Sequence, residues 1–504
     1  MNKKLKTPNV FASFTAKQKI IVYSIIGIFT LVFCSISLVN HYLFRTSAYD
    51  LGIYNQVLYS YAHFKISHTP IQQPLIFHIF ADHFEPIFIL FAPLYYLFGS
   101  YTLLVIQIAL IVAGGIGMLR FAWLISKSFN LSVAILVQFY GMWGVYSALS
   151  FDFHNNVTAA MLLPWLLVFI EEKKIKPALI IWILMLFSKE NMALFTGFVC
   201  LGLGLHYFKQ KPLRNLLFGA GVLSFIYFVV VVKLFIPFFL PDDTPYLYES
   251  HYKALGNGFG DVLMRFMAEP GYVFSLLFEH PNKELFYAGI KSEFHFAILV
   301  CGGVFLFFKP QFLFMLIPIY AQKLFISDAT RWGINYHYSI ELVPVVSAAT
   351  LFFIHQNLSS TKLKLFLPWL VVMSTLLHTQ SKIKSRTSIW YDALYTNFLL
   401  PQHYQTHFDV NKAKQQLKRF NNNESISAQT DLVPWLANRD SIYLYPATSH
   451  ARYIVLAPGT RAYPYNDSTY YANLDTLYKS AYWKAVETAD TLKIFERVTP
   501  NIKQ

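Results

Sequence analysis

The chain has 504 residues, of which 55% are hydrophobic and only 13% are charged. Soluble domains usually carry about 25% charged residues, so this composition excludes an ordinary soluble protein and requires lipid to cover much of the surface. The formal net charge of +14 would suggest a nucleic-acid partner in a soluble protein, but here the basic residues fall between apolar segments, so no nucleic acid is expected.

The apolar runs predict an α-helical polytopic membrane protein with about eleven transmembrane helices. The first run follows a basic segment, MNKKLKTPNV, and no small-residue cleavage site comes after it, so we interpret it as a retained helix. Several later runs are shorter than the roughly 20 residues of a straight span, so broken or re-entrant helices are expected. The short, proline-flanked segment 86–98 is expected to be interfacial or half-inserted. The expected spans are 20–39, 101–123, 131–149, 157–170, 177–189, 191–207, 214–239, 294–308, 311–327, 339–355 and 364–379.

The basic residues between these runs predict the orientation, because cytoplasmic loops carry an excess of Lys and Arg. With the N-terminus in the cytoplasm, the alternation of spans leaves few basic residues on the other face: Arg45, Lys65, Lys189 and Arg331. The cytoplasmic set is Lys3, Lys4, Lys6, Lys17, Lys19, Lys127, Lys173, Lys174, Lys176, Lys209, Lys211, Arg214, Lys309, Lys362 and Lys364.

Outside the membrane, this topology leaves two large loops, 40–100 and 240–293, and a tail that begins at about residue 380. We therefore divide the chain into a membrane domain, 1–379, and a small extracytoplasmic α/β domain, 380–504. Within the tail, NKAKQQLKRF is amphipathic, DLVPWLANR is typical of a helix, and WKAVETADTLKIFERV predicts two strands around a turn. The tail contains no GxGxxG and no P-loop.

Polar clusters at the ends of spans are the candidate functional residues, because burying such groups in a membrane is expensive. RTSAYDLGIYNQ follows the first span and carries Asp50, which is either functional or a helix cap in an interfacial loop. HIFADHFEP places Asp82, His83 and Glu85 close together, as metal-ligand or acid–base chemistry requires, although the spacing matches no zinc signature. The alternative for that segment is a solvated polar bend before a helix.

Three further clusters fall between later spans. SFDFHNN carries Asp152 and His154, and SKEN carries Lys189 and Glu190, which are costly there unless they line a cavity, pair, or form a charged outer turn. RWGINYHY adds Arg331, His337 and Tyr338, and its arginine is suited to hold a phosphate bidentately. The topology places every cluster on the same outer face, which predicts a polar cavity for an anionic, lipid-linked substrate. A carboxylate there would act as a general base or hold a divalent cation, for which Asp50 and Asp82 are the candidate ligands.

These motifs also carry a resemblance. AYDLGIYNQ, ADHFEPIFILFAPLYYLFG, SFDFHNN, LFSKENMAL, INYHYSIELVP and LVPWLANRDSIYLYP, in this order, resemble a bacterial multi-pass membrane family, domain of unknown function 2079. That family is similar to the GT-C membrane glycosyltransferases, which use a polyprenyl-phosphate-linked sugar and carry an acidic catalytic residue shortly after the first span. Asp50 stands where that residue would be. DHFEP stands where protein mannosyltransferases and aminoarabinose transferases carry a proline-containing motif, although it lacks the paired prolines of the HPPL form.

The resemblance implies a sugar transferase at the outer face of the bacterial inner membrane, with membrane lipid and a polyprenyl-phosphate-linked sugar as partners. Asp50 would be the base or the first metal ligand, and Asp82 with His83 and Glu85 the second acidic element. Lys189, Arg331 and His337 would contact the lipid phosphate, and the tail would recognise the acceptor or cap the cavity.

Two alternatives stay open at this point. A transporter or flippase for a lipid-linked or anionic solute would need charges deep in several helices, and Lys233 is the main one. A non-catalytic scaffold of envelope assembly would need no carboxylate at all.

Overall fold

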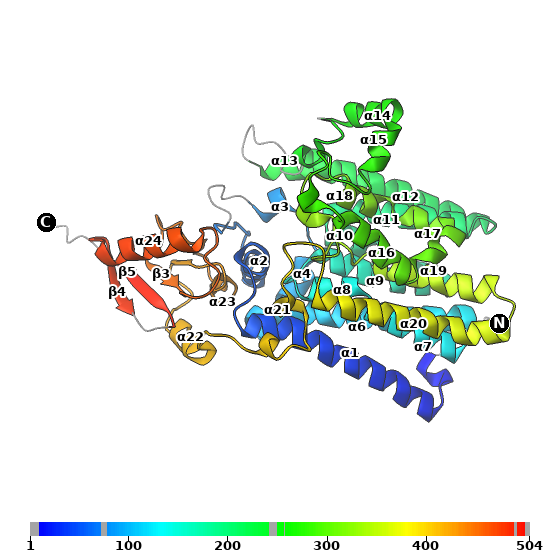
Figure 1. Cartoon of the computed structure of the whole chain (residues 1–504), viewed down its shortest axis with the longest axis horizontal. Helices are drawn as coiled ribbons and strands as arrows, with labels where there is room; N and C mark the ends of the chain where they lie inside the picture. The colour runs from blue at the N-terminus through cyan, green and yellow to red at the C-terminus, as the bar shows by residue number, and fades with distance from the viewer. Residues whose placement is uncertain (1–9, 72–77, 241–248, 257, 488–490, 499–504) are drawn as a thin grey trace.

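The computed structural model describes residues 10–71, 78–240, 249–256, 258–487 and 491–498, and it is mostly helical with one small sheet near the C-terminus. The long helices run side by side to form a bundle, and the sheet lies beyond one end of that bundle (Figure 1). The predicted fold class, a helical membrane protein with a small C-terminal sheet, is confirmed at this level.

Every apolar run predicted to span is helical in the structure. The elements are α1 (Ala16–Tyr42), α6 (Thr102–Ser126), α7 (Phe129–Gly141) with α8 (Trp143–Leu149), α9 (Asn155–Glu171), α10 (Ile175–Ser188), α11 (Glu190–His206), α12 (Lys211–Val230) continued by η5 (Val231–Phe235) and α13 (Ile236–Phe239), α16 (Ile290–Val300) with η8 (Gly303–Phe308), α17 (Pro310–Met315) with α18 (Ile317–Leu324), α19 (Leu342–Asn357) and α20 (Thr361–Lys384). The segment 86–98 forms the short helices α4 (Phe88–Phe91) and α5 (Tyr95–Phe98), which lead into α6.

Fewer helices than predicted are clear spans by length and composition. In the described part of the chain, three stretches qualify, Ala16–Tyr42, Phe88–Ser126 and Lys211–Phe239, and α7 with α8, bent by 42°, would make a fourth. The other apolar helices are shorter or interrupted; proline opens α17 and stands at Pro318 near the start of α18. The structure therefore supports a helical bundle with several short or broken members, and it does not by itself give eleven full spans.

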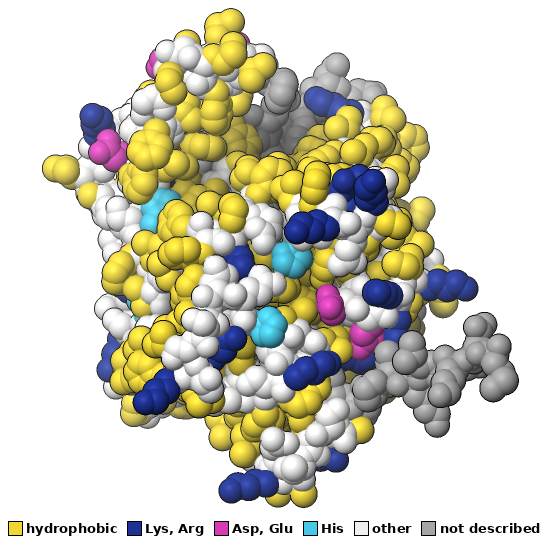
Figure 2. Space-filling view, turned by 90° about the vertical axis from the view of Figure 1, so that its right-hand side faces the viewer, with side chains coloured by type: hydrophobic (Ala, Val, Ile, Leu, Met, Phe, Trp, Pro, Cys, Tyr) yellow, Lys and Arg dark blue, Asp and Glu magenta, His cyan; other side chains and the backbone are white. Residues whose placement is uncertain are grey.

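The two ends of the bundle differ in charge. The described basic residues that the sequence assigned to the cytoplasm lie in the connections after α6, α9, α11 and η8 and at the starts of α1, α10, α12 and α20. Lys3, Lys4 and Lys6 lie outside the described residues. Viewed from the end far from the sheet, Lys and Arg side chains gather on the surface and few acidic ones accompany them (Figure 2). The polar clusters lie at the other ends of these helices, away from the basic connections.

The C-terminal sheet has five strands in the order β2-β1-β3-β5-β4. β1 (Ile426–Ala428) pairs in parallel with β2 (Ile442–Leu444) and β3 (Tyr453–Leu456), with Ser427 opposite both Tyr443 and Ile454. β5 (Lys493–Arg497) is antiparallel to β3 and forms the predicted hairpin with β4 (Trp483–Glu487). α22 (Val410–Leu417) and α23 (Val433–Leu436) form where the amphipathic and helix-like segments were expected, and α24 (Asp467–Lys479) covers one face.

The other face of the sheet packs against the first large loop. That loop contains η2 (Ala48–Gly52), α2 (Ile53–Ala62) and α3 (Ile79–Asp82). Alternation along the strands decides the partners, since Val455 and Ile494 face the loop while Ile454 and Phe495 face α24. Loop residues such as Leu51 and Val57 share one hydrophobic cluster with these strands. The boundary between domains at residues 379 and 380 stays a prediction, but the sheet and the loop form a common core.

A tight contact in this core involves Gly52, on the turn that carries Asp50. A Cβ atom at Gly52 would lie 2.8 Å from Cγ1 of Val433. The backbone of Gly52 is α-helical, so space rather than backbone freedom favours glycine here.

We predict that Gly52→Ala lowers the free energy of unfolding by roughly 1–3 kcal/mol, because the added methyl group overpacks this contact. Thermal unfolding in detergent measures the effect. Gly27→Ala is the matched control, since nothing lies within 4 Å of a Cβ there. The double variant Gly52→Ala/Val433→Ala should lose less stability than the sum of the single losses. An additive double variant would contradict the contact.

Candidate functional site

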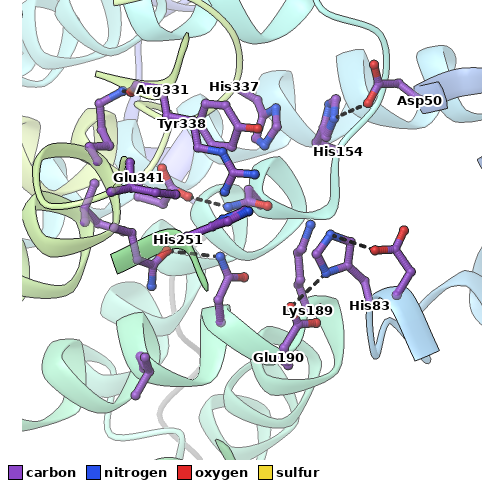
Figure 3. Close-up of a pocket in the computed structure, with 18 of the residues that line it drawn as sticks. Asp50, His83, His154, Lys189, Glu190, His251, Arg331, His337, Tyr338 and Glu341 are labelled. Atoms are coloured by element: carbon purple, nitrogen blue, oxygen red, sulfur yellow. Dashed lines mark hydrogen bonds and ion pairs between the residues drawn. The ribbon is translucent and has the colours of Figure 1, made fainter. Parts of the chain in front are cut away.

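A polar cavity of about 480 Å³ lies where the predicted clusters converge. It is lined from η2, α3, the start of α9, the α10–α11 turn, α18 and the loop before α19, so distant segments meet in one site (Figure 3). Among the predicted residues it brings together Asp50, Asp82, His83, His154, Lys189, Glu190, Arg331, His337 and Tyr338.

Asp50 projects from a π-helical turn, η2, that follows α1 after a short extended stretch. His154 Nε2 lies 3.1 Å from Asp50 Oδ1, and the Asp50 side chain stays 23% exposed. The carboxylate is therefore both anchored and accessible to a ligand, as a general base requires.

Asp152 lies behind this turn and does not line the cavity. Its Oδ2 accepts a hydrogen bond of 2.7 Å from the backbone N–H of Ser47, at the start of η2. Burial, together with the nearby charge of Asp50, raises the pKa of Asp152 to about 7. Its backbone has φ of 49°, a left-handed conformation that Asp tolerates better than most residues. Asp152 thus holds the turn that presents Asp50.

Two stacked imidazole rings separate Asp50 from the basic side of the cavity. The rings of His154 and His337 lie 3.6 Å apart at 15°, and Phe151 extends the stack with its centroid 5.1 Å from that of His154. Burial and the neighbouring His154 lower the pKa of His337 well below its usual value. His337 is therefore neutral at pH 7 and is suited to hydrogen bonding rather than to carrying charge.

A buried ion network surrounds the DHFEP segment. Glu190 accepts from the backbone N–H of Phe84 at 3.0 Å and pairs with His83, whose Nδ1 lies 2.8 Å from Oε1. Burial and Lys189 lower the pKa of His83, but Glu190 and Asp82 outweigh them, and the net shift is upward. His83 and Glu190 thus fix DHFEP to the start of α11.

Glu85 is only 1% exposed and lies outside the cavity lining. Its Oε1 is 3.7 Å from Nζ of Lys189, and burial raises the pKa of Glu85 to about 7 although Lys189 opposes the shift. Its two oxygens have no hydrogen-bond partner among the described residues. Glu85 therefore acts on the site through Lys189, and Lys189 faces the cavity.

The opposite side of the cavity is basic. Arg331 is held by Asp328, with Nε 3.2 Å from Oδ2, and its guanidinium lies 5.1 Å from the ring centre of Tyr338. Lys323 donates to the carbonyl oxygens of Arg331 and Gly333, at 2.8 Å each. In Figure 3, Arg331 and Asp50 lie on opposite sides, with His337 and His154 between them.

Several polar lining residues were not among the predicted site residues. Tyr54, Asn156 and Asn191 stand within the predicted polar clusters, whereas His251, Tyr252, Gln322, Lys323 and Glu341 do not. Lys323 and Glu341 interrupt apolar runs, so the cost of burial that selected Lys189 would also have selected them. His251 comes from the second large loop, and no local pattern marks it.

The two predicted metal ligands, Asp50 and Asp82, both line the cavity. In the described residues, no three His, Cys, Asp or Glu side chains lie together so as to hold a metal ion. Asp50 is engaged by His154, and Asp82 lies beside His83. The divalent cation stays a prediction, and the reaction proposed for this site does not depend on it.

The fold and the cavity together define a mostly helical membrane protein with a polar cavity among its helices. Its structure is similar to that of ArnT from Cupriavidus metallidurans bound to undecaprenyl phosphate, with a TM-score of 0.50, 11% identity, and coverage of 96% of this chain and 99% of that one. The chain belongs to the DUF2079 family of predicted membrane proteins, whose model matches residues 40–485. The resemblance found in the motifs is confirmed.

A lower similarity, with a TM-score of 0.40 and 12% identity, relates 84% of the chain to the oligosaccharyltransferase of Archaeoglobus fulgidus, of which it spans 63%. No curated protein sequence matches the chain significantly.

We predict that Asp152→Asn changes the pH dependence of stability. With a folded-state pKa of about 7 and an ordinary unfolded value, wild type loses the contribution of Asp152 to stability as pH rises from about 4 to about 7. The substituted amide cannot ionise, so the stability of the variant relative to wild type should rise by about 2–3 kcal/mol between pH 5 and pH 7. Melting temperatures in detergent across this range measure the difference. If the melting temperatures of wild type and Asp152→Asn changed in parallel with pH, the raised pKa of Asp152 would be contradicted.

Proposed function

We propose that this protein is a glycosyltransferase of the GT-C type that moves a sugar from a polyprenyl-phosphate carrier to an acceptor at the outer face of the bacterial inner membrane. The observation that carries the proposal is a single cavity with an accessible carboxylate, Asp50, on one side and a basic group, Arg331, on the other. A transfer reaction needs these two functions, one for the incoming hydroxyl and one for the departing phosphate.

The donor would place its phosphate near Arg331 and Lys189. Arginine presents a planar fork of donors that matches phosphate oxygens, and the lysine adds a point charge. Leu194, Phe228, Ile319 and Ile326 give the same cavity an apolar side, which suits the first isoprene units. That ArnT binds undecaprenyl phosphate supports this class of ligand.

In the proposed reaction, Asp50 accepts the proton of the acceptor hydroxyl as its oxygen bonds to C1 of the sugar. The bond between C1 and the phosphate oxygen breaks, and polyprenyl phosphate leaves with the electron pair. Arg331 and Lys189 stabilise its charge, and neutral His337 can donate a hydrogen bond. His154 orients Asp50, while Asp82, His83 and Glu85 form the second acidic element, which holds Lys189 and α11 in place.

We further propose about eleven membrane passes, with several short or broken helices, and a cytoplasmic N-terminus. The basic face of the bundle supports this orientation, because Lys and Arg concentrate on cytoplasmic loops (Figure 2). The cavity and the C-terminal sheet would then be extracytoplasmic, where the sheet covers the turn that carries Asp50.

We predict that Asp50→Ala and Asp50→Asn lower transfer by about 100-fold or more, because both remove the base. The assay follows the release of polyprenyl phosphate by mass spectrometry, with carrier-linked sugars and acceptors extracted from bacterial membranes. Asp475→Ala, at an exposed site on α24, is the control and should keep wild-type activity. Wild-type activity in Asp50→Asn would remove Asp50 from the chemistry.

We predict that Arg331→Ala raises the KM for the donor roughly 10–100-fold, since a charge-assisted contact to phosphate is lost. Arg331→Lys should restore part of that loss, because it keeps the charge without the fork. Steady-state kinetics with increasing donor make the measurement, and Arg452→Ala, at a surface ion pair on the sheet, is the control. An unchanged KM would exclude Arg331 as the phosphate ligand.

A further inference from the structure

A second cavity, of about 280 Å³, lies between the bundle and the C-terminal sheet, next to the first. It is lined by three arginines from separate segments: Arg45 after α1, Arg386 after α20, and Arg461 before α24. Asp152 and Asp392 are its acidic residues.

The arginines are not equally neutralised. Arg461 pairs with the buried Asp431. Arg45 instead donates to carbonyl oxygens, with the shortest contacts at 2.7 Å to His403 and 2.6 Å to Gln405. Four carbonyl oxygens thus hold the guanidinium by Nη1 and Nη2, and no carboxylate lies within ion-pair distance of it among the described residues.

Arg386 is held by carbonyl and amide oxygens, and its guanidinium lies 4.3 Å from the ring centre of Tyr391. Its Nε donates to the carbonyl of Lys382 at 3.0 Å, and Nη1 donates to the carbonyl of Ile334 at 2.7 Å and to Asn335 Oδ1 at 3.1 Å. Nη2 is buried and has no hydrogen-bond partner among the described residues. A buried donor without a partner is costly, and an anion would satisfy it.

Aromatic side chains separate the second cavity from Asp50. Phe151 and Tyr336 line the second cavity, and their rings lie 4.2 Å apart. Phe151 stacks at 5.1 Å on His154, which contacts Asp50 from the side of the first cavity. Ser47 and Asp152, at the base of the Asp50 turn, also line the second cavity. A ligand held there lies beside the base of the turn that carries Asp50.

We propose that the second cavity binds a phosphate group of the acceptor, with Arg386 and Arg45 as its ligands. This inference rests on the proposed transferase function and assigns it an anionic acceptor. The phosphate would be held beside the turn while the acceptor hydroxyl reaches Asp50. Its source is either a lipid headgroup or a soluble phosphorylated molecule, which share this chemistry.

Binding to the purified full-length protein tests the proposal without any transfer assay. The probes are inorganic phosphate and dioctanoyl phosphatidate, and the readout is the saturable rise in melting temperature. Arg386→Gln should weaken binding about 10-fold, because it removes a charged ligand. Arg386→Lys should keep part of the affinity, and Arg45→Gln provides a second test if Arg386→Gln unfolds. Arg419→Gln, at an exposed ion pair, is the control.

The outcomes separate this proposal from the donor site. Loss of binding in Arg386→Gln with retention in Arg331→Ala supports a second phosphate site even if transfer is never observed. Tighter binding of phosphatidate identifies a lipid acceptor, and equal binding of both probes identifies a soluble one. Loss in Arg331→Ala with retention in both Arg386→Gln and Arg45→Gln would overturn the proposal, as would the absence of saturable binding to wild type.

Discussion

The hydrogen bond from the Ser47 N–H to the Asp152 carboxylate is the contact on which the site depends. It fixes the turn η2, which carries Asp50, against the loop between α8 and α9. The same loop supplies His154, so one short segment both anchors the turn and orients its carboxylate. The helix α23, beside the sheet, closes the other side of the turn through Val433, and a short extended stretch joins α1 to the turn. Bundle, loop and sheet therefore meet at Asp50.

Charged residues are distributed unevenly between the surface of the bundle and its cavity. One end of the bundle is basic at its surface (Figure 2). The cavity instead encloses both acidic and basic groups. Inside the cavity, His83 is neutralised by Glu190, and Lys189 approaches the buried Glu85. These pairs lower the cost of burying charge near the membrane. Asp50 and Arg331 remain available to a substrate on opposite sides of the cavity. A transfer reaction uses one group for the incoming hydroxyl and the other for the departing phosphate.

Much of this arrangement could be predicted from the sequence, because membrane helices appear in it as long apolar runs. Each polar residue that interrupts such a run is costly to bury in the membrane, so it marks a candidate site. All the runs are helical, and most polar interruptions reach one cavity, although Glu85 and Asp152 lie behind it as supports. Lys323 and Glu341 were missed because they sit inside runs that were counted as spans. His251 and the strand order β2-β1-β3-β5-β4 depend on contacts between distant segments, and no local periodicity encodes them.

Cryo-electron microscopy of the full-length protein in nanodiscs with undecaprenyl phosphate would test the central claim most directly. We expect density for the phosphate within hydrogen-bond distance of Arg331, and density for the prenyl chain along Phe228 and Ile319. Asp50 should remain on the opposite side of the cavity, open to an acceptor. Phosphate density elsewhere on the protein, with the cavity between Asp50 and Arg331 unoccupied by lipid, would contradict the assignment of this cavity as the donor site.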